Sequence, residues 1–312
     1  MKVLHLITGL EVGGAETMLL NLLKQPTFAN EVSRVVSLTN IGVIGSRIQK
    51  LGTDVVALGM EPGHPELKGF SQLVHILRSD PPDLIQSWMY HADFLGSLAA
   101  FFCGNIPIVW GLHHTLDGDH PVQKSTMRIV QANAFLSRWS PKKVICCAES
   151  ARLAHIRAGY ISSKLIVIPN GIDLNEFSPD LNARSEVRSE IGVDLQTPLI
   201  GMFARFHPQK DHKNFISAAG ILHESFPGVH FLLAGAGITP DNREMLTWLQ
   251  ASGILDQTHL LGLREDMPRL MSAVDIASLS SAYGEALPLV IAESMACGIP
   301  CAVTNIGDSA LI

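Results

Sequence analysis

Short apolar runs alternate with helix-length segments along the whole sequence, and this alternation constrains the fold more than any other feature. The runs that predict strands in the first half are Val3–Ile7, Val32–Leu38, Val55–Leu58, Leu84–Ser87, Ile106–Trp110, Val144–Cys147 and Leu165–Ile168. A second series comprises Leu199–Phe203, Val229–Ala234, Thr258–Leu261, Ile276–Ser280 and Cys301–Val303. Such alternation is typical of βαβ units with parallel strands. Because 47% of the residues are hydrophobic and only 17% are charged, we predict doubly wound α/β units whose sheets are covered on both faces.

The length of 312 residues fits two such domains. The alternation pauses in a turn-rich stretch from Pro169 to Asp180, which we interpret as a hinge. We therefore predict an N-terminal domain at residues 1–178 and a C-terminal domain at residues 179–312. Because Ile312 follows directly on a predicted strand and its loop, we expect the second domain to be incomplete.

The composition disfavours several classes of protein. No apolar stretch approaches the roughly 18 residues needed to cross a bilayer, and Met1-Lys2 leads directly into a predicted strand rather than a signal peptide. We therefore predict a cytoplasmic protein. The five cysteines form neither an even set nor a paired CxxC array, which disfavours a disulfide framework and structural zinc. The net charge of −6 and the 6% aromatic content disfavour nucleic-acid binding.

A glycine-rich segment, residues 9–16 (GLEVGGAE), lies where the first predicted strand ends and a helix begins. Gly13 and Gly14 would let the backbone approach a bound group, and a helix N-terminus favours an anion. The segment lacks the GxGxxG pattern, so it carries no dinucleotide fingerprint. A tight turn that needs positive φ is an equal alternative for these glycines.

Two cations follow the predicted strand Leu199–Phe203. Arg205 offers a fork of donors and Lys210 a point charge, and both suit a diphosphate beyond the carboxyl end of a strand. In isolation, solvated surface charge is the default alternative. Their place beyond a strand end favours the binding interpretation.

The segment Tyr283–Pro300 (YGEALPLVIAESMACGIP) contains the strongest signal. Pro288 fits the first turn of a short helix and Gly298 fits the position after its end. The backbone amides of Ala286 and Leu287 would then point toward an anion over the helix start.

Two glutamates belong to this segment. Glu285 lies in the loop before the predicted helix, and Glu293 lies within the helix in a run that is otherwise apolar apart from Ser294. A carboxylate there is costly to bury unless it accepts hydrogen bonds, and a ribose diol offers two donors. The alternative makes Glu285 a neighbour of the helix cap and Glu293 the partner of an arginine.

At these three segments the chain resembles the retaining GT-B glycosyltransferases of family 4, also called group 1 transferases. The resemblance covers essentially the whole chain, and its most specific element is the E-x7-E pattern of Glu285 and Glu293. It implies two Rossmann-like domains whose parallel sheets face each other across a cleft. The first would bind the acceptor, and the second would hold most of a nucleotide-sugar donor.

The resemblance also implies roles for single residues. Gly13 and Gly14 match the glycine loop that lies against the donor phosphate. Arg205 and Lys210 match the pair that binds the diphosphate and stabilises the leaving nucleotide. Glu285 matches the glutamate beside the transferred sugar.

Further matches concern the rest of the donor. The amides of Ala286 and Leu287 match donors to sugar or phosphate oxygens, and Glu293 matches the residue that binds the ribose. Leu263 and Arg264 belong to a segment that resembles the loop whose backbone meets the base.

A histidine near the reacting carbon of the sugar is also implied by the resemblance. His113 matches it, and the adjacent His114 leaves the choice between the two open. Without the family, a lone histidine at a strand end is more often structural.

The implied reaction transfers a hexose from a UDP- or GDP-sugar to an acceptor hydroxyl with retained anomeric configuration, in the synthesis of a cell-surface polysaccharide or glycolipid. No cofactor and no metal are expected. Asp117-Gly118-Asp119 has the spelling of a metal motif and is interpreted as incidental. The alternatives are a GT-B nucleotide-sugar epimerase and a non-catalytic nucleotide-binding module.

The acceptor, a glycan or a lipid-linked sugar, is expected on the first domain. Residues 120–164 hold eight Lys or Arg and one acidic residue, Glu149. With Phe135 and Trp139, this basic run is a candidate surface for anionic lipid at the inner face of the membrane. An ordinary solvated helix face is the alternative.

Overall fold

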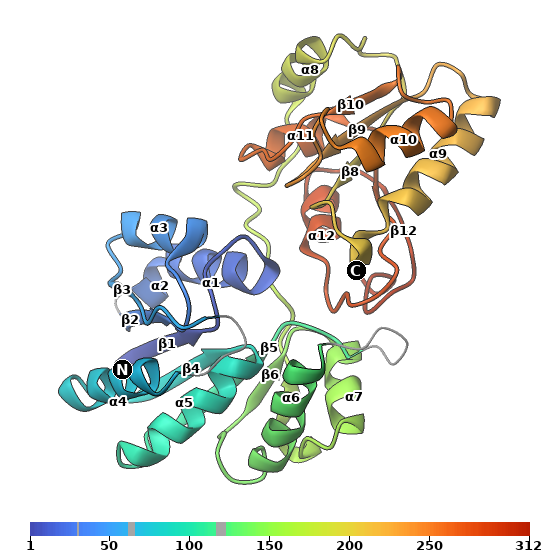
Figure 1. The fold of residues 1–312 in the computed structure, drawn as a ribbon. Coiled ribbons are helices and arrows are strands. Elements are labelled where there is room, and N and C mark those ends of the chain that lie inside the picture. Colours follow the sequence, from blue (N-terminus) through green and yellow to red (C-terminus); the bar gives the residue numbers. More distant parts are fainter. Residues whose placement is uncertain (30, 62–65, 117–122) are drawn as a thin grey trace. The chain divides into compact units, whose positions relative to one another are not determined.

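Every apolar run that predicts a strand forms one, and the strands pair in parallel. They form two separate sheets, one in each of two units, Met1–Gly171 and Ile172–Ile312 (Figure 1). The predicted α/β class is thereby confirmed for each unit. The computed structural model describes residues 1–29, 31–61, 66–116 and 123–312.

The sheet of the first unit has the strand order β3-β2-β1-β4-β5-β6-β7. Its strands are β1 (Val3–Ile7), β2 (Val32–Ser37), β3 (Val55–Ala57), β4 (Leu84–Trp88), β5 (Ile108–Leu112), β6 (Val144–Cys146) and β7 (Leu165–Val167). Its helices are α1 (Gly14–Lys24), α2 (Pro26–Ala29), α3 (Gly42–Lys50), α4 (Leu67–Ser79), α5 (Tyr90–Phe102), α6 (Lys124–Leu136), α7 (Glu149–Arg157) and the 3₁₀ turn η1 (Ser162–Lys164). Figure 1 shows α1 to α3 on one face and α4 to α6 on the other, so helices cover both faces.

The sheet of the second unit has the order β10-β9-β8-β11-β12. Its strands are β8 (Leu199–Phe203), β9 (His230–Ala234), β10 (Thr258–Leu260), β11 (Ile276–Leu279) and β12 (Cys301–Val303). Its helices are α8 (Leu181–Glu190), α9 (His212–Ser225), α10 (Arg243–Ala251), α11 (Met267–Ala273), α12 (Leu289–Ala296) and the 3₁₀ turn η2 (Pro208–Lys210). In both sheets the strand order reverses at one point, between β1 and β4 and between β8 and β11.

Burial explains why continuous apolar runs became strands. All five residues of β1 are buried, and even His5 is only 4% exposed. Two aspartates start helices of the second unit: Asp180 accepts a hydrogen bond from the Ala183 amide at 2.9 Å, and Asp211 accepts one from the Asn214 amide at 3.2 Å. These side chains satisfy donors that a helix N-terminus otherwise leaves unpaired. In the described part of the chain, no helix has the length and apolar character needed to cross a bilayer.

The boundary between the units lies earlier than the predicted position after residue 178. Phe177 is buried in the core of the second unit with Val187 and Leu199, and Ile172 packs against the same core. The turn-rich stretch therefore contributes apolar side chains to the second unit. The turn-forming residues around Phe177 led us to predict a hinge there, and the sequence alone does not reveal this packing.

Arg188 attaches α8 to the second sheet. Its side chain is 1% exposed, and Nε donates to the Ala273 carbonyl at 2.8 Å while Nη2 donates to Asp275 Oδ2 at 2.8 Å. The same carboxylate oxygen accepts a hydrogen bond from the Leu199 amide at the start of β8. A buried guanidinium is tolerated because its donors find acceptors.

We predict that Arg188→Met destabilises the second unit by about 3–5 kcal/mol, because it leaves Asp275 without its most buried partner. Urea unfolding followed by circular dichroism measures the loss. Arg184→Met is the matched control, since Arg184 also binds Asp275 but has a 23% exposed side chain. Equal losses in the two variants would contradict the assigned role of Arg188.

Candidate functional site

The charged residues predicted to bind the donor lie at the carboxyl ends of β8 and β11. Arg205 and Lys210 follow β8, and Glu285 follows β11. The strand order of the second sheet reverses between these two strands. In doubly wound sheets the crevice at such a reversal is where ligands bind.

Lys210 and Glu285 meet there as an ion pair, with Lys210 Nζ donating to Glu285 Oε1. Their side chains are 18% and 8% exposed, so the pair is largely removed from water. Ser281 Oγ donates to the same carboxylate oxygen at 2.6 Å. The structure therefore joins two site residues that are 75 positions apart, and adds Ser281, which the sequence interpretation missed.

The loop after β8 carries a positive potential. Arg205 is exposed and, within the described residues, its guanidinium has no ion pair or hydrogen bond. The pKa of His207 is lowered by partial burial and then by the charges of Arg205 and Lys210. An unpaired cation at this edge is suited to an anionic ligand.

The start of α12 adds two donors. Within the described residues, the backbone amides of Ala286 and Leu287 donate to no protein acceptor. The loop after β12 fixes the backbone of this segment, because the Asp308 amide donates to the Ala286 carbonyl at 2.9 Å. A Cβ atom at Gly307, which has φ +61°, would collide with the Glu285 carbonyl, so only glycine allows this approach.

Glu293 lies within α12 and is mostly buried. Burial, followed by the charge of Glu176, raises the pKa of its carboxyl to about 7. The predicted alternative, an arginine partner for Glu293, is absent from the described residues. A buried carboxylate without a cation is an acceptor that the fold itself does not use.

We predict that Glu293→Gln stabilises the protein near pH 8 and has little effect near pH 5. The raised pKa means that the folded state keeps a proton between pH 4.5 and about 7 which the unfolded chain releases, so stability falls as pH rises through this window. The amide avoids this loss, which is at most about 3 kcal/mol.

Melting temperatures from pH 5 to pH 8 provide the measurement. Glu224→Gln, at an exposed position of α9, is the control and should leave the pH dependence unchanged. A difference between Glu293→Gln and wild type that stays constant with pH would exclude the assigned titration.

The segment predicted to meet the base lies after β10. Leu263 is 60% exposed, whereas Arg264 donates to Asp266 at 2.8 Å and to Glu190 at 2.6 Å. Because this guanidinium is already paired, the backbone and Leu263 are the groups of this segment left to contact a ligand.

In the first unit, Gly13 and Gly14 lie at the start of α1. Gly13 has φ −161°, which is ordinary extended backbone, and neither glycine has positive φ. The alternative of a turn that needs positive φ is therefore wrong. A Cβ atom at Gly13 would collide with the carboxylate of Glu16, so this acidic side chain folds back over the helix start. A phosphate bound there would have to displace it.

His113 follows β5 and stacks on Trp88, with ring centroids 4.9 Å apart and an interplanar angle of 18°. Trp88 Nε1 in turn donates to His5 Nδ1 at 3.1 Å. Burial lowers the pKa of His113 to about 4, so its imidazole is neutral at pH 7. Its Nδ1 is buried without a hydrogen-bond partner among the described residues. His114 is half-buried as well and makes interactions of its own, so the choice between the two histidines stays open. A neutral ring with an unused nitrogen can bond a ligand hydroxyl.

Two further features lie outside these clusters. The described residues contain no group of three His, Cys, Asp or Glu side chains that could hold a metal ion, and Asp117-Gly118-Asp119 falls outside those residues.

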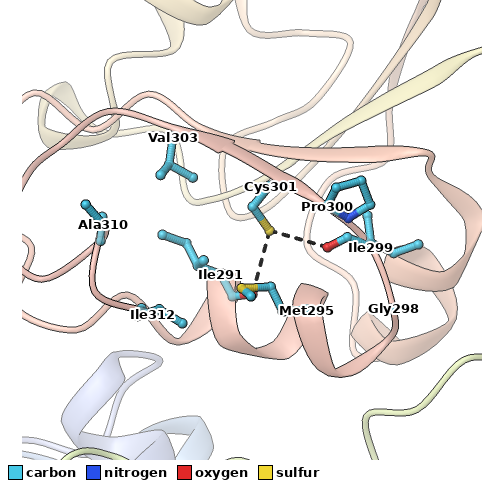
Figure 2. A pocket seen from close by; sticks show the side chains of 10 residues that line it. Ile291, Met295, Gly298, Ile299, Pro300, Cys301, Val303, Ala310 and Ile312 are labelled. Atoms are coloured by element: carbon cyan, nitrogen blue, oxygen red, sulfur yellow. Dashed lines mark hydrogen bonds between the residues drawn. The ribbon is translucent and has the colours of Figure 1, made fainter.

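A groove of ≈ 570 Å³ lies between α12 and β12, lined by apolar residues such as Ile291, Met295 and Val303 (Figure 2). It contains none of the predicted site residues and offers no charged side chain.

A family model described as Glycosyltransferase Family 4 matches residues 12–176, and one described as Glycosyl transferases group 1 matches residues 183–310. This chain belongs to that family of glycosyltransferases. The chain is 26% identical over 251 residues to the UDP-Gal:alpha-D-GlcNAc-diphosphoundecaprenol alpha-1,3-galactosyltransferase of Escherichia coli. That alignment covers 79% of this chain and 64% of the relative's length.

Solved structures resemble this chain over all of the given sequence. Alr3699/HepE of Anabaena in complex with UDP has a TM-score of 0.83 at 26% identity, and its complex with UDP-glucose has 0.86 at 24%. Each comparison covers 100% of this chain and 82% of HepE. WaaG, a glycosyltransferase involved in lipopolysaccharide biosynthesis, has a TM-score of 0.73 at 15% identity, covering 99% and 82% of the two chains. These likenesses confirm the GT-B fold class.

Proposed function

We propose that this glycosyltransferase is a retaining family 4 enzyme that transfers a hexose from a UDP- or GDP-sugar to the hydroxyl of a glycan or lipid-linked acceptor. The product belongs to a cell-surface polysaccharide or glycolipid. The observation that carries the proposal is the Lys210–Glu285 pair at the reversal of the second sheet, beside the exposed Arg205. The UDP complexes of HepE and the donor of the E. coli relative support a uridine nucleotide.

The leaving diphosphate would be bound by charge and by amides. Arg205 and Lys210 neutralise the negative charge that develops when the bond to the sugar breaks. The unpaired amides of Ala286 and Leu287 add donors from the start of α12. These groups take the place that a bridging metal has in other phosphate sites, so we propose metal-independent transfer.

The sugar and the nucleoside would be held by acceptors. Glu285 accepts hydrogen bonds from hydroxyls of the transferred sugar once Lys210 turns to the diphosphate. Glu293 accepts from the ribose diol. On the first unit, Gly13 and Gly14 approach a donor phosphate, and the neutral imidazole of His113 bonds a sugar hydroxyl near the reacting carbon.

We predict that UDP- or GDP-sugars raise the melting temperature of the full chain, since a ligand that binds only the folded state stabilises it.

Glu293→Ala should weaken donor binding by about 10- to 100-fold, because a buried acceptor to two hydroxyls is lost. Arg205→Ala and Glu285→Gln should lower kcat by about 10²- to 10³-fold, because both act on the transition state.

Calorimetry and product analysis with an acceptor measure these effects. Arg269→Ala is the matched control for Arg205→Ala, because Arg269 is a surface cation of the same unit that pairs with Glu186. Unchanged kinetics in all three site variants would defeat the site assignment. Formation of an epimeric sugar from the donor alone, without an acceptor, would indicate an epimerase.

We further propose that the enzyme binds the inner face of the membrane through an aromatic and basic surface of the first unit. Phe135, in the last turn of α6, and Trp139, in the turn that follows the helix, are 61% and 64% exposed and form an edge-to-face pair with centroids 4.8 Å apart. Arg138, Lys142 and Lys143 are exposed beside them in sequence. Exposed aromatics with adjacent cations suit the interface of an anionic bilayer.

We predict that the wild-type protein sediments with vesicles containing phosphatidylglycerol and not with neutral vesicles. Changing Lys142 and Lys143 together to Glu should reduce binding by at least about tenfold, since each basic residue near an anionic surface contributes roughly 1 kcal/mol. Lys50→Glu with Lys68→Glu gives the same charge change at exposed positions elsewhere on the unit. Equal sedimentation of both double variants would count against this surface.

A further inference from the structure

Two adjacent serines after β11, Ser280 and Ser281, contact the two residues of the ion pair, one through a backbone carbonyl and the other through the carboxylate. Ser281 is only 1% exposed, and its Oγ donates to Glu285 Oε1 at 2.6 Å. The hydroxyl thus binds the carboxylate itself. It does so on the same oxygen that Lys210 Nζ contacts.

Ser280 binds the backbone that carries Lys210. Its Oγ lies 2.9 Å from the carbonyl oxygens of both Lys210 and Asp211. Asp211 has φ 46° and ψ 55°, a left-handed conformation that is uncommon for residues other than glycine. It ends η2 and starts α9, and a non-glycine residue holds this conformation only where its surroundings fix it. The bond from Ser280 is one such constraint.

The serines are themselves held on both sides. Thr304 Oγ1 donates to the Ser281 carbonyl at 2.6 Å, from the residue after β12. The Ala282 amide donates to the Gln209 carbonyl at 2.9 Å, which ties the segment after β11 to η2. Three separate segments therefore converge on the pair of serines.

We propose that Ser280 and Ser281 are positioning residues for the transfer reaction: Ser280 fixes the backbone from which Lys210 reaches the diphosphate, and Ser281 fixes the carboxylate of Glu285. The inference rests on the proposed function of that site. A bound diphosphate competes with Glu285 for Lys210. When Lys210 turns toward the phosphate, Ser281 keeps the carboxylate aimed at the sugar.

The two serines have different kinetic consequences. Ser281 orients a group that acts on the sugar as it departs, so Ser281→Ala should lower kcat by about tenfold and change the donor KM by less than about twofold. Ser280 supports a group that binds the diphosphate before and during the reaction. Ser280→Ala should therefore raise the donor KM by about tenfold.

Matched variants separate positioning from loss of a buried hydroxyl. Ser272 is equally buried on α11 and donates to the Pro268 carbonyl at 3.0 Å, away from the ion pair. Ser272→Ala should leave kcat and KM unchanged. Ser281→Thr keeps the hydroxyl and should restore most of the kcat lost in Ser281→Ala. A kcat for Ser281→Ala within about twofold of Ser272→Ala would overturn the inference.

A second measurement does not depend on activity. Melting temperatures of Ser281→Ala, Glu285→Ala and the double variant form a cycle, and coupled side chains give non-additive shifts. We expect the double variant to melt at the temperature of Glu285→Ala alone, because Glu285→Ala already removes the acceptor of the Ser281 hydroxyl. Additive shifts would overturn the inference whatever the kinetics show. If no nucleotide sugar is bound or consumed by the wild type, the proposed function is wrong, while the cycle still decides whether Ser281 holds Glu285.

Discussion

The ion pair between Lys210 and Glu285 is the interaction on which the candidate site depends. Each side chain is largely removed from water, and a charge in that position is costly unless an opposite charge and hydrogen bonds accompany it. The pair forms because β8 and β11 are neighbours although their loops are far apart in the chain. Under the proposed function, a diphosphate replaces Glu285 as the partner of Lys210, and the released carboxylate becomes available to the sugar. The same contact would then stabilise the empty site and prepare it for the donor.

The two units place different chemistry at equivalent points of similar sheets. In the first unit the imidazoles of His5 in β1 and His113 after β5 are neutral at pH 7, since burial lowers the pKa of both to about 4, although the Glu16 carboxylate lies over the start of α1. In the second unit the groups near the reversal are charged, and Arg205 is exposed without a partner in the described residues. A neutral imidazole beside Trp88 can order hydroxyls without attracting the diphosphate, whereas Arg205 attracts it. Under the proposed function, His113 would therefore serve a sugar hydroxyl and Arg205 the diphosphate.

The sequence predicted the strands well because parallel strands covered on both faces have continuous apolar runs. It predicted their ends less well: the run beginning at Ile106 forms a strand only from Ile108, after a proline that lacks an amide for the ladder. The motif around Glu285 located one side of the site. It could not reveal Ser281 or Gly307, because their contacts with Glu285 depend on how three loops converge. The units divide after Gly171 rather than after residue 178 for a similar reason, since only packing shows that Phe177 belongs to the second core.

Under the proposed function, Glu293 shows how a residue that binds a polar ligand differs from a core residue that serves stability alone. An apolar side chain at this position of α12 would avoid the desolvation that raises the pKa of the carboxyl to about 7. Apart from Ser294, the neighbouring positions of the helix are apolar, so nothing in the helix itself requires a carboxylate there. A buried acceptor without a cation is favourable only when a ligand brings donors to it. The cost in stability is therefore itself an argument that α12 contacts a hydroxyl-rich ligand.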